Sequence, residues 1–592
     1  MTDIAYYDPL TQKTPMGVIS KNNNVIFKIK INKNYNYKFV QLMIREDEEK
    51  EYKYIFMKKN CDFYEANFYF EKAGHYFYNF QIAINNEIKY LNKTFDNYSY
   101  LSNEKGDDFF QLVTNEEYKS TNSLQGGIIY QILVDRFCRV GEVKNREPPK
   151  LRDDWGGKIK KYTTDPVKLN TEVFGGNLSG VISKLSYLKE LGVTAIYFNP
   201  ICQANSHHKY DTADYMKIDD MYGTEEEFKI LIKKAKSLDI KIIIDGVYNH
   251  TGSDSIYFNK ENRFESVGAY NSKNSKYYSW YNFKNNKEEY DSWWGIKTLP
   301  SIKKDCRDFQ EFIAGKNGVI EKFMEMGVFG IRLDVVDELT DEFTKKISNK
   351  IMSYNQDAVI MGEVWEDAST KISYDKRRKY FKDNELNSVM NYPLKEAIIN
   401  YLKTKNPREL NSTIRMLLNN YPKIVLDNLM NSLGTHDTNR IYTEIKSFTS
   451  DEEISKSLLK IAFILLFTLP GVPTIFYGDE YGMENNDSNP RGCFDWKNYE
   501  NDIYKFIKKL SKIRNYKSLK DGEIKIRCCQ DGKFAFERIG ENEQIIVLVN
   551  LGRTMFPVKQ NGKFFSFFSQ KERKNICLMP NEFEILISQK ND

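Results

Sequence analysis

Three acidic residues each end a short apolar run and could act as an acid, a base or a nucleophile. Asp334 closes Gly-Ile-Arg-Leu-Asp, Glu363 stands in Met-Gly-Glu-Val-Trp, and Asp437 closes Gly-Thr-His-Asp. Asp245 follows the apolar run Lys241–Ile244 in the same way. Barrel enzymes place catalytic groups at one rim by ending β-strands in such residues, which lead into loops and helices. The sequence therefore predicts carboxyl chemistry at the rim of a barrel.

The rare histidines follow the same distribution. The chain has five, and four of them lie in strand-end loops: His207, His208, His250 and His436. Imidazole groups can bind hydroxyls or transfer protons, so their placement supports a single site near the carboxyl residues.

The elements that must carry these residues alternate between strands and helices from about residue 127 onward. Short apolar runs predict eight strands, at Ile128–Val134, Ala195–Phe198, Lys241–Ile244, Val328–Leu333, Ala358–Met361, Ser388–Met390, Leu429–Leu433 and Thr474–Tyr477. Helical spacing intervenes, as at Leu178–Leu191, Glu225–Ser237, Phe309–Met326 and Ser455–Thr468. This alternation predicts an α/β fold, a (β/α)8 TIM barrel.

Two β-rich regions flank the predicted barrel, which we assign to residues 119–515. Residues 1–118 alternate apolar and polar positions, as in Val25–Ile31, and predict an N-terminal β-sandwich. Residues 516–592 return to a strand pattern and predict a small C-terminal β-sandwich. A long insertion at about 251–305, after the third strand, is rich in Tyr, Trp, Asn and Lys. Loops of this length in compact domains are usually functional.

Composition limits the class of protein. Hydrophobic residues make up 41% of the 592 residues, enough for several packed domains. No apolar run is long enough to cross a membrane, and no secretory signal pattern is visible. Eight irregularly spaced cysteines favour a reducing cytoplasm. The 87 basic and 82 acidic side chains are interspersed, which argues against a nucleic-acid partner.

Four segments together resemble, in the same order, the signature regions of the α-amylase family (glycoside hydrolase family 13). They are Asp245–His250, Gly330–Asp334, Gly362–Trp365 and Gly434–Asp437. The likeness extends to His208–Tyr215, Phe174–Gly176 and Tyr477–Glu480. These segments are most similar to the neopullulanase, cyclomaltodextrinase and amylopullulanase branch of the family. The resemblance covers nearly the whole chain and implies a barrel glycosidase.

The resemblance implies a role for each carboxyl residue. Asp334 would be the nucleophile, Glu363 the general acid/base, and Asp437 the carboxylate that orients the sugar at subsite −1. Retaining hydrolysis needs a nucleophile and an acid roughly 5–5.5 Å apart. Arg332, two positions before Asp334, would lie on the same side of its strand and hold that carboxylate ionised. A less polar wall, from Trp365 or Val364, should keep Glu363 protonated.

Further residues would hold the substrate. By resemblance, His250 and His436 would bind hydroxyls of the −1 sugar, and Tyr210 would stack beneath its ring. The full predicted substrate-binding set is Tyr210, Asp211, His250, Arg332, His436, Asp487 and Arg491. In it, Asp487 and Arg491 match a pair that grips the next sugar. Sugar C–H faces pack on aromatic rings, so three tryptophans of the insertion are candidate platforms: Trp280, Trp293 and Trp294. The alternative is that these side chains only pack within the insertion.

No cofactor is expected to be required. Asn177 stands where many relatives have an aspartate of a calcium site, so calcium would lose a charged ligand and bind weakly. Asp153 and Asp154 could compensate, and the sequence leaves the identity of any metal site unknown.

The leading interpretation is an intracellular α-glucan hydrolase. It would cleave α-1,4 bonds, with α-1,6 bonds as a further option, in maltodextrins, starch fragments, pullulan or cyclodextrins, through a covalent glycosyl-aspartate intermediate. A transglycosylase or branching enzyme would carry the same three carboxyl residues and is the alternative. A non-catalytic carbohydrate-binding relative would be expected to lose them. The expected partners are oligo- and polysaccharides; no nucleic acid or membrane is expected, and a homodimer remains open.

Overall fold

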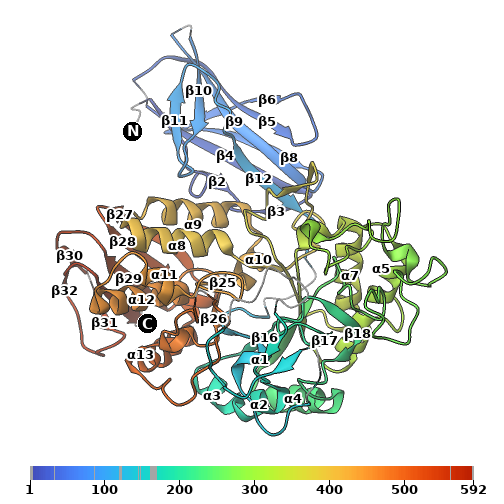
Figure 1. Cartoon of the computed structure of the whole chain (residues 1–592). Helices are drawn as coiled ribbons and strands as arrows, with labels where there is room; N and C mark the ends of the chain where they lie inside the picture. Colours follow the sequence, from blue (N-terminus) through green and yellow to red (C-terminus); the bar gives the residue numbers. More distant parts are fainter. Residues whose placement is uncertain are drawn as a thin grey trace.

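Eight parallel strands form a ring in the computed structural model. Three of them, β16, β25 and β26, are labelled in the middle of Figure 1. In chain order they are β13 (Ile129–Ile132), β16 (Ala195–Phe198), β19 (Lys241–Gly246), β20 (Gly330–Leu333), β21 (Val359–Gly362), β24 (Ser388–Val389), β25 (Met430–Ser432) and β26 (Val472–Phe476). Neighbours in the chain are neighbours in the sheet, and β26 returns to β13. A parallel bridge between Met390 and Met430 joins β24 to β25 and closes the ring. The predicted TIM barrel is confirmed.

The structure describes residues 4–32, 34–85, 87–118, 123–144, 146, 149–159, 170–487, 489–560 and 562–589. Within these ranges, no helix is long and apolar enough to cross a membrane.

Successive residues of each barrel strand point alternately into the barrel and toward the helices. Tyr197 and Ile243 belong to the cluster of buried side chains inside the barrel. Their neighbours Ile196 and Ile242 belong to the core between the strands and the helices. Both faces are therefore apolar, which explains why these strands appear in the sequence as continuous apolar runs.

Helices cover the outside of the barrel, and the last of them, α14, packs on the C-terminal strands β28 (Lys533–Ile539) and β29 (Glu543–Asn550). The helices are α1 (Val134–Phe137), α2 (Leu178–Ser183), α3 (Leu185–Glu190), α4 (Glu225–Ser237), α5 (Arg307–Ala314), α6 (Val319–Glu325), α7 (Asp341–Tyr354), α8 (Tyr392–Thr404), α9 (Arg408–Asn420), α10 (Lys423–Asn428), α11 (Ile441–Lys446), α12 (Glu452–Thr468), α13 (Asp502–Leu510) and α14 (Lys517–Lys520). The single helix predicted over 309–326 is wrong, because α5 and α6 are separate. The segment between them contains Gly315 and Gly318, and Asn317 adopts a left-handed φ of 56°, which ends an α-helix.

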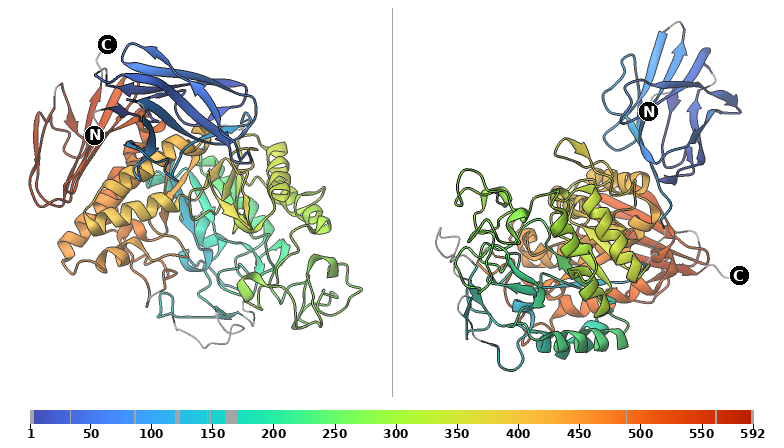
Figure 2. Two further views of the ribbon diagram at one scale, coloured as in Figure 1. Left: turned by 90° about the horizontal axis from the view of Figure 1, so that it is seen from above. Right: turned by 90° about the vertical axis from the view of Figure 1, so that its right-hand side faces the viewer.

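The N-terminal region forms two facing sheets, as predicted. One contains β1 (Ala5–Tyr6), β2 (Lys13–Thr14), β4 (Asn23–Ile31), β7 (Lys58–Asn60) and β8 (Phe63–Phe70). The other contains β3 (Ile19–Ser20), β5 (Tyr37–Glu46), β6 (Lys53–Phe56), β9 (Gly74–Ile84), β10 (Glu87–Lys93), β11 (Ser99–Ser102) and β12 (Phe110–Asn115). Figure 2 shows this domain, in blue, outside the barrel. Arg415 of α9 binds Asp8 at 2.6 Å, and Lys13 Nζ donates to Asn419 Oδ1 at 3.0 Å, so the domain docks on α9.

The C-terminal region also forms β-structure. Its main sheet contains β27 (Glu523–Gln530), β28 (Lys533–Ile539), β29 (Glu543–Asn550), β31 (Phe565–Ser566) and β33 (Glu582–Gln589), and β30 (Phe556–Lys559) pairs with β32 (Asn575–Leu578). Phe536 and Val547 of the main sheet share one apolar core with the barrel helices. Ala535 and Leu548, on the opposite face, pack toward β30 and β32.

The insertion at 251–305 has little regular structure beyond two short turns, η1 (Tyr278–Trp280) and η2 (Trp293–Gly295). Aromatic packing holds it together. The Phe258 ring lies 4.9 Å from that of Tyr281 and 4.7 Å from that of Tyr290, measured between centroids. The insertion is thus an ordered wall beside the third barrel strand.

Candidate active site

One buried arginine holds three carboxyl groups together. The Arg332 side chain on β20 is fully buried, and its Nη1 lies 2.8 Å from Asp245 Oδ1 and 2.8 Å from Asp334 Oδ1. Its Nη2 lies 2.8 Å from Glu363 Oε2. These carboxyl groups come from three adjacent strands, because β19, β20 and β21 are neighbours in the barrel. The nucleophile and the acid/base of the sequence prediction therefore share one guanidinium group.

Strand pairing continues right up to these residues. The amide of Asp334 donates to the carbonyl of Gly246, and the amide of Glu363 donates to that of Leu333. Both side chains therefore leave rigid backbone at the carboxyl ends of the strands, where barrel enzymes place their chemistry. Directly after Asp334, Val335 turns the chain with a left-handed φ of 38°.

The surroundings of Glu363 differ from the prediction. The Val335 amide donates to Oε2 at 2.7 Å, and the Trp365 indole Nε1 donates to Oε1 at 3.0 Å. The Trp365 ring stacks on Tyr392, with centroids 4.0 Å apart. Val364 is buried in the core between strands and helices. The expected apolar wall is therefore wrong: Trp365 faces the carboxyl group with its polar edge, and Val364 does not line the site.

Asp437 lies in a second network of hydrogen bonds. Its Oδ2 lies 2.9 Å from His436 Nε2, and its Oδ1 lies 3.1 Å from Arg491 Nη2. The Gln131 amide nitrogen contacts His436 Nδ1 at 3.0 Å. Because an amide nitrogen only donates, Nδ1 accepts and Nε2 carries the proton that faces Asp437.

Tyr210 connects the two networks. Its hydroxyl donates to Asp245 Oδ2 at 2.8 Å and lies 2.6 Å from His436 Nε2. Its ring stacks on that of His436, with an angle of 6° between planes. Tyr197 also donates to Asp245 Oδ2, at 2.7 Å. Asp245 therefore fixes the position of Tyr210 as well as that of Arg332.

The three candidate catalytic carboxyl groups have different electrostatic surroundings. Burial raises the pKa of Asp334 well above its ordinary value; the Arg332 guanidinium opposes this, and the Glu363 and Asp245 carboxyls add to it. Burial also pushes the pKa of Asp437 upward, but His436 and Arg491 outweigh it and hold that pKa below its usual range. Asp437 is therefore ionised at neutral pH, whereas burial makes the charged form of Asp334 less favourable than it would be in water.

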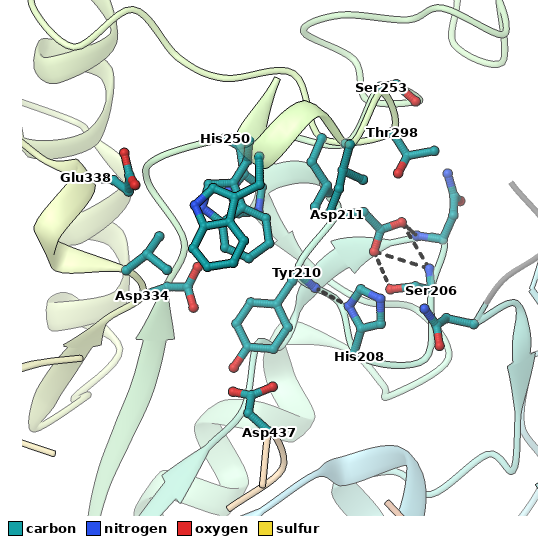
Figure 3. Close-up of a pocket in the computed structure, with 18 of the residues that line it drawn as sticks. Ser206, His208, Tyr210, Asp211, His250, Ser253, Thr298, Asp334, Glu338 and Asp437 are labelled. Carbon is teal, nitrogen blue, oxygen red and sulfur yellow. Dashed lines mark hydrogen bonds between the residues drawn. The ribbon is translucent and has the colours of Figure 1, made fainter. Parts of the chain in front are cut away.

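These residues open into one cavity of about 800 Å³. Figure 3 shows Asp334, Tyr210 and Asp437 in the same part of this cavity, with His250 nearby. Burial lowers the pKa of His250 to about 4, so its imidazole is neutral at pH 7. A concave site with convergent polar groups suits a ligand rich in hydroxyls.

The insertion contributes two of the three predicted tryptophans to the cavity. Trp293 and Trp294 line it. Trp280 does not: it is 4% exposed and packs against Tyr257 and Phe309. Trp280 is therefore a packed interior residue, and for it the alternative to a sugar platform is correct.

Two predicted substrate-binding residues have contacts of another kind. Asp211 lines the cavity but accepts hydrogen bonds from the backbone amides of Asn205 and Ser206, so it braces that loop. Asp487 is 45% exposed in its side chain and lies 3.6 Å from Lys158, whereas Arg491 lines the cavity. Among the described residues Asp487 and Arg491 share no contact, and their common role stays a prediction.

Several site residues were missed in the sequence. Gln131 and Tyr197 point into the barrel top from β13 and β16, and Tyr392 supports Trp365. Gln131 did carry a signal, since it is a polar residue inside the apolar run Ile128–Val134. Tyr197 and Tyr392 carried none, because tyrosine is common in buried positions.

The side chain at the position of the predicted calcium site is engaged by backbone groups. Asn177 Oδ1 accepts from the Gly180 amide at 2.8 Å, and its amide nitrogen donates to the Val140 carbonyl at 2.8 Å. Asp154 binds Arg152 at 2.5 Å. Across the described part of the chain, no three His, Cys, Asp or Glu side chains are placed to hold a metal ion.

Comparison with known proteins shows the family of this chain. The alpha-amylase catalytic domain family matches residues 131–515. The chain is 32% identical over 488 residues to an amylopullulanase from Thermoanaerobacterium saccharolyticum, covering 73% of this chain and 37% of the relative. It is 30% identical over 448 residues to neopullulanase 2 from Thermoactinomyces vulgaris, covering 74% of this chain and 71% of that relative. The chain spans only 26% to 37% of the length of the amylopullulanases it matches.

Solved structures share the fold over the whole chain. A cyclomaltodextrinase superposes with a TM-score of 0.71 at 22% identity, covering 99% of both chains. The type III pullulan hydrolase from Thermococcus kodakarensis superposes with a TM-score of 0.70 at 22% identity, covering 98% of this chain and all of the other. Both matches include the N-terminal sheets as well as the barrel. With its barrel, its carboxyl residues at the strand ends and its match over residues 131–515, the chain belongs to the α-amylase family, glycoside hydrolase family 13.

Proposed function

We propose that this protein is a retaining α-glucan hydrolase. The observation that carries the proposal is that Asp334 and Glu363 lie 2.8 Å from different nitrogens of the single guanidinium of Arg332. Two carboxyl groups held side by side in this way suit retaining hydrolysis, which needs one as nucleophile and one as acid.

The reaction then proceeds in two displacements. The Asp334 carboxylate attacks the anomeric carbon while Glu363 gives its proton to the glycosidic oxygen, and the bond between that carbon and that oxygen breaks. Glu363, now a carboxylate, takes a proton from water, whose oxygen attacks the same carbon and releases Asp334. Asp437, held ionised by its partners, would bind hydroxyls of the sugar and stabilise positive charge that develops on its ring.

The substrates we propose are maltodextrins, pullulan and cyclodextrins, with cleavage of α-1,4 bonds and, as a further activity, α-1,6 bonds. The names of the relatives, amylopullulanase, neopullulanase and cyclomaltodextrinase, support this range. A cytoplasmic location is supported by the cysteines, because all eight are free. A requirement for calcium is not supported by the contacts of Asn177. A homodimer stays a prediction, which sedimentation in solution can check.

A product profile tests the proposal. Purified protein is incubated with pullulan and with maltohexaose, and the products are separated by chromatography. Panose from pullulan indicates α-1,4 cleavage, and maltotriose indicates α-1,6 cleavage. Products longer than maltohexaose would show that transglycosylation, and not hydrolysis, is the main activity. The absence of any product would favour a carbohydrate-binding protein instead.

A further inference from the structure

An exposed tryptophan stands at the mouth of the cavity in an unfavourable backbone conformation. Trp294 is 82% exposed and has φ 49° and ψ 29°. A non-glycine residue in this left-handed region is strained. An indole left in water also forgoes the free energy that its burial would contribute. Within the described residues, Trp294 belongs to no apolar cluster of the core, so folding does not repay these costs.

Trp294 is the outermost of three rings. The His250 and Trp293 rings stack with centroids 5.5 Å apart and 29° between planes. The Trp293 and Trp294 rings stack with centroids 5.2 Å apart and 19° between planes. All three residues line the cavity, and His250 begins the row close to the candidate nucleophile. We call this row the ring ladder; it runs from the reacting centre toward solvent.

The charge of the cavity decides what the ring ladder can bind. Nine residues that line the cavity are Asp or Glu, and three are Lys or Arg. This excess of acid repels a polyanion, so stacked nucleotide bases are disfavoured as ligands. A neutral chain with many hydroxyls and apolar C–H faces fits both the rings and the carboxyl groups.

We propose that Trp294 is a platform for a sugar at an outer subsite, far from the cleaved bond of a bound α-glucan chain; this inference rests on the proposed function. It therefore makes this enzyme prefer longer linear chains over short ones. The left-handed backbone turns the indole outward, where a sugar several units away from the cleaved bond can cover it. The contact acts on binding of the chain and not on the reacting bond, so it affects KM more than kcat.

The test compares two substrates of different length. For the W294A variant we expect kcat/KM on maltoheptaose to fall about tenfold relative to kcat/KM on 4-nitrophenyl maltoside, mainly through KM. W294F should retain most of the preference for the longer chain, because it keeps an aromatic face. W294G should lose it as W294A does, without loss of thermal stability, because glycine adopts the left-handed backbone freely. The matched control is F56A, which removes another exposed ring, on β6 (67% exposed), and should change neither rate.

A binding measurement separates this proposal from the proposed function. Maltoheptaose is titrated calorimetrically into D334N and into D334N/W294A, which needs no turnover. About tenfold weaker binding by the double variant supports the platform, even where the wild type hydrolyses nothing. Equal affinity of the two proteins, or an unchanged ratio of the two rates in W294A, overturns it.

Discussion

Replacing Asp334 by asparagine separates its chemical role from its structural one. Asparagine has the same shape, and its Oδ1 can keep the contact of 2.8 Å to Arg332 Nη1. It cannot form the covalent ester with the sugar. We expect turnover to fall by about 10⁴- to 10⁶-fold, as for removal of other catalytic nucleophiles. At 1.36 kcal/mol per tenfold, this corresponds to about 5–8 kcal/mol of lost transition-state stabilisation.

The same variant should not lose stability at neutral pH. Burial raises the pKa of Asp334 in the folded protein above its unfolded value. A carboxyl with a raised pKa is most favourable to the fold below its unfolded pKa, near 4, and its contribution falls as pH rises toward the folded pKa. Asparagine does not titrate. D334N should therefore be at least as stable as the wild type at pH 7, and should lose that advantage near pH 4.

The assay pairs initial rates with thermal unfolding. Rates are measured on 4-nitrophenyl maltoside and maltohexaose with freshly purified protein, because deamidation of asparagine would restore the enzyme. Unfolding is followed at pH 7 and at pH 4. Residual turnover above about 1% of wild type in a stably folded sample would contradict the role of Asp334 as nucleophile. A large loss of stability at pH 7 would contradict the assigned direction of its pKa.

Four further outcomes follow from the site. E363Q should lower the rate of maltohexaose hydrolysis by about 10²- to 10⁴-fold. It should lower the first step on 4-nitrophenyl maltoside much less, because that leaving group needs no proton. Equal losses of rate on both substrates would refute an acid role. R491M should raise the pKa of Asp437, because it removes the guanidinium that contacts this carboxylate. A carboxyl with a lowered pKa stabilises the fold at pH values above its unfolded pKa and loses that contribution on acidification, so the variant should lose activity and stability at a higher pH than the wild type. An acid limb of the pH–rate profile that does not move would count against this contact. W280A should lower the free energy of unfolding, measured with urea, by about 3–5 kcal/mol, because the ring is buried. A decrease below about 1 kcal/mol would show that Trp280 is not part of the core. EDTA should change neither rates nor melting temperature, given the contacts of Asn177; a clear drop in either would establish a metal.

The barrel was predictable from sequence because both faces of its strands are buried. Each strand then reads as a short apolar run such as Ala195–Phe198, which the structure reproduces without change. The closing contact between Met390 and Met430 was not predictable, since parallel pairing depends on residues far apart in the chain. The division of 309–326 into two helices was missed because apolar spacing continues across Gly315 and Gly318.

In the site, the sequence indicated residue types and positions but not how their side chains are oriented. Glu363 and Trp365 were placed correctly at one strand end, yet the indole presents its N–H edge rather than its apolar face. Similarly, three tryptophans of one insertion looked equivalent in sequence. Packing then buries Trp280 and leaves Trp294 in solvent, and that choice is made by tertiary contacts that no local pattern contains.

The arrangement of charge suggests why this site needs a single arginine. One guanidinium faces three carboxyl groups, from Asp245, Asp334 and Glu363, so it cannot neutralise all of them. Burial makes the excess negative charge costly, and retaining a proton is the way to reduce it. Asp437 is compensated separately, because His436 and Arg491 hold its pKa below the usual range despite its burial. Burial therefore raises the pKa of the nucleophile Asp334 against the opposing charge of Arg332, and a second cation near Arg332 would counteract that rise.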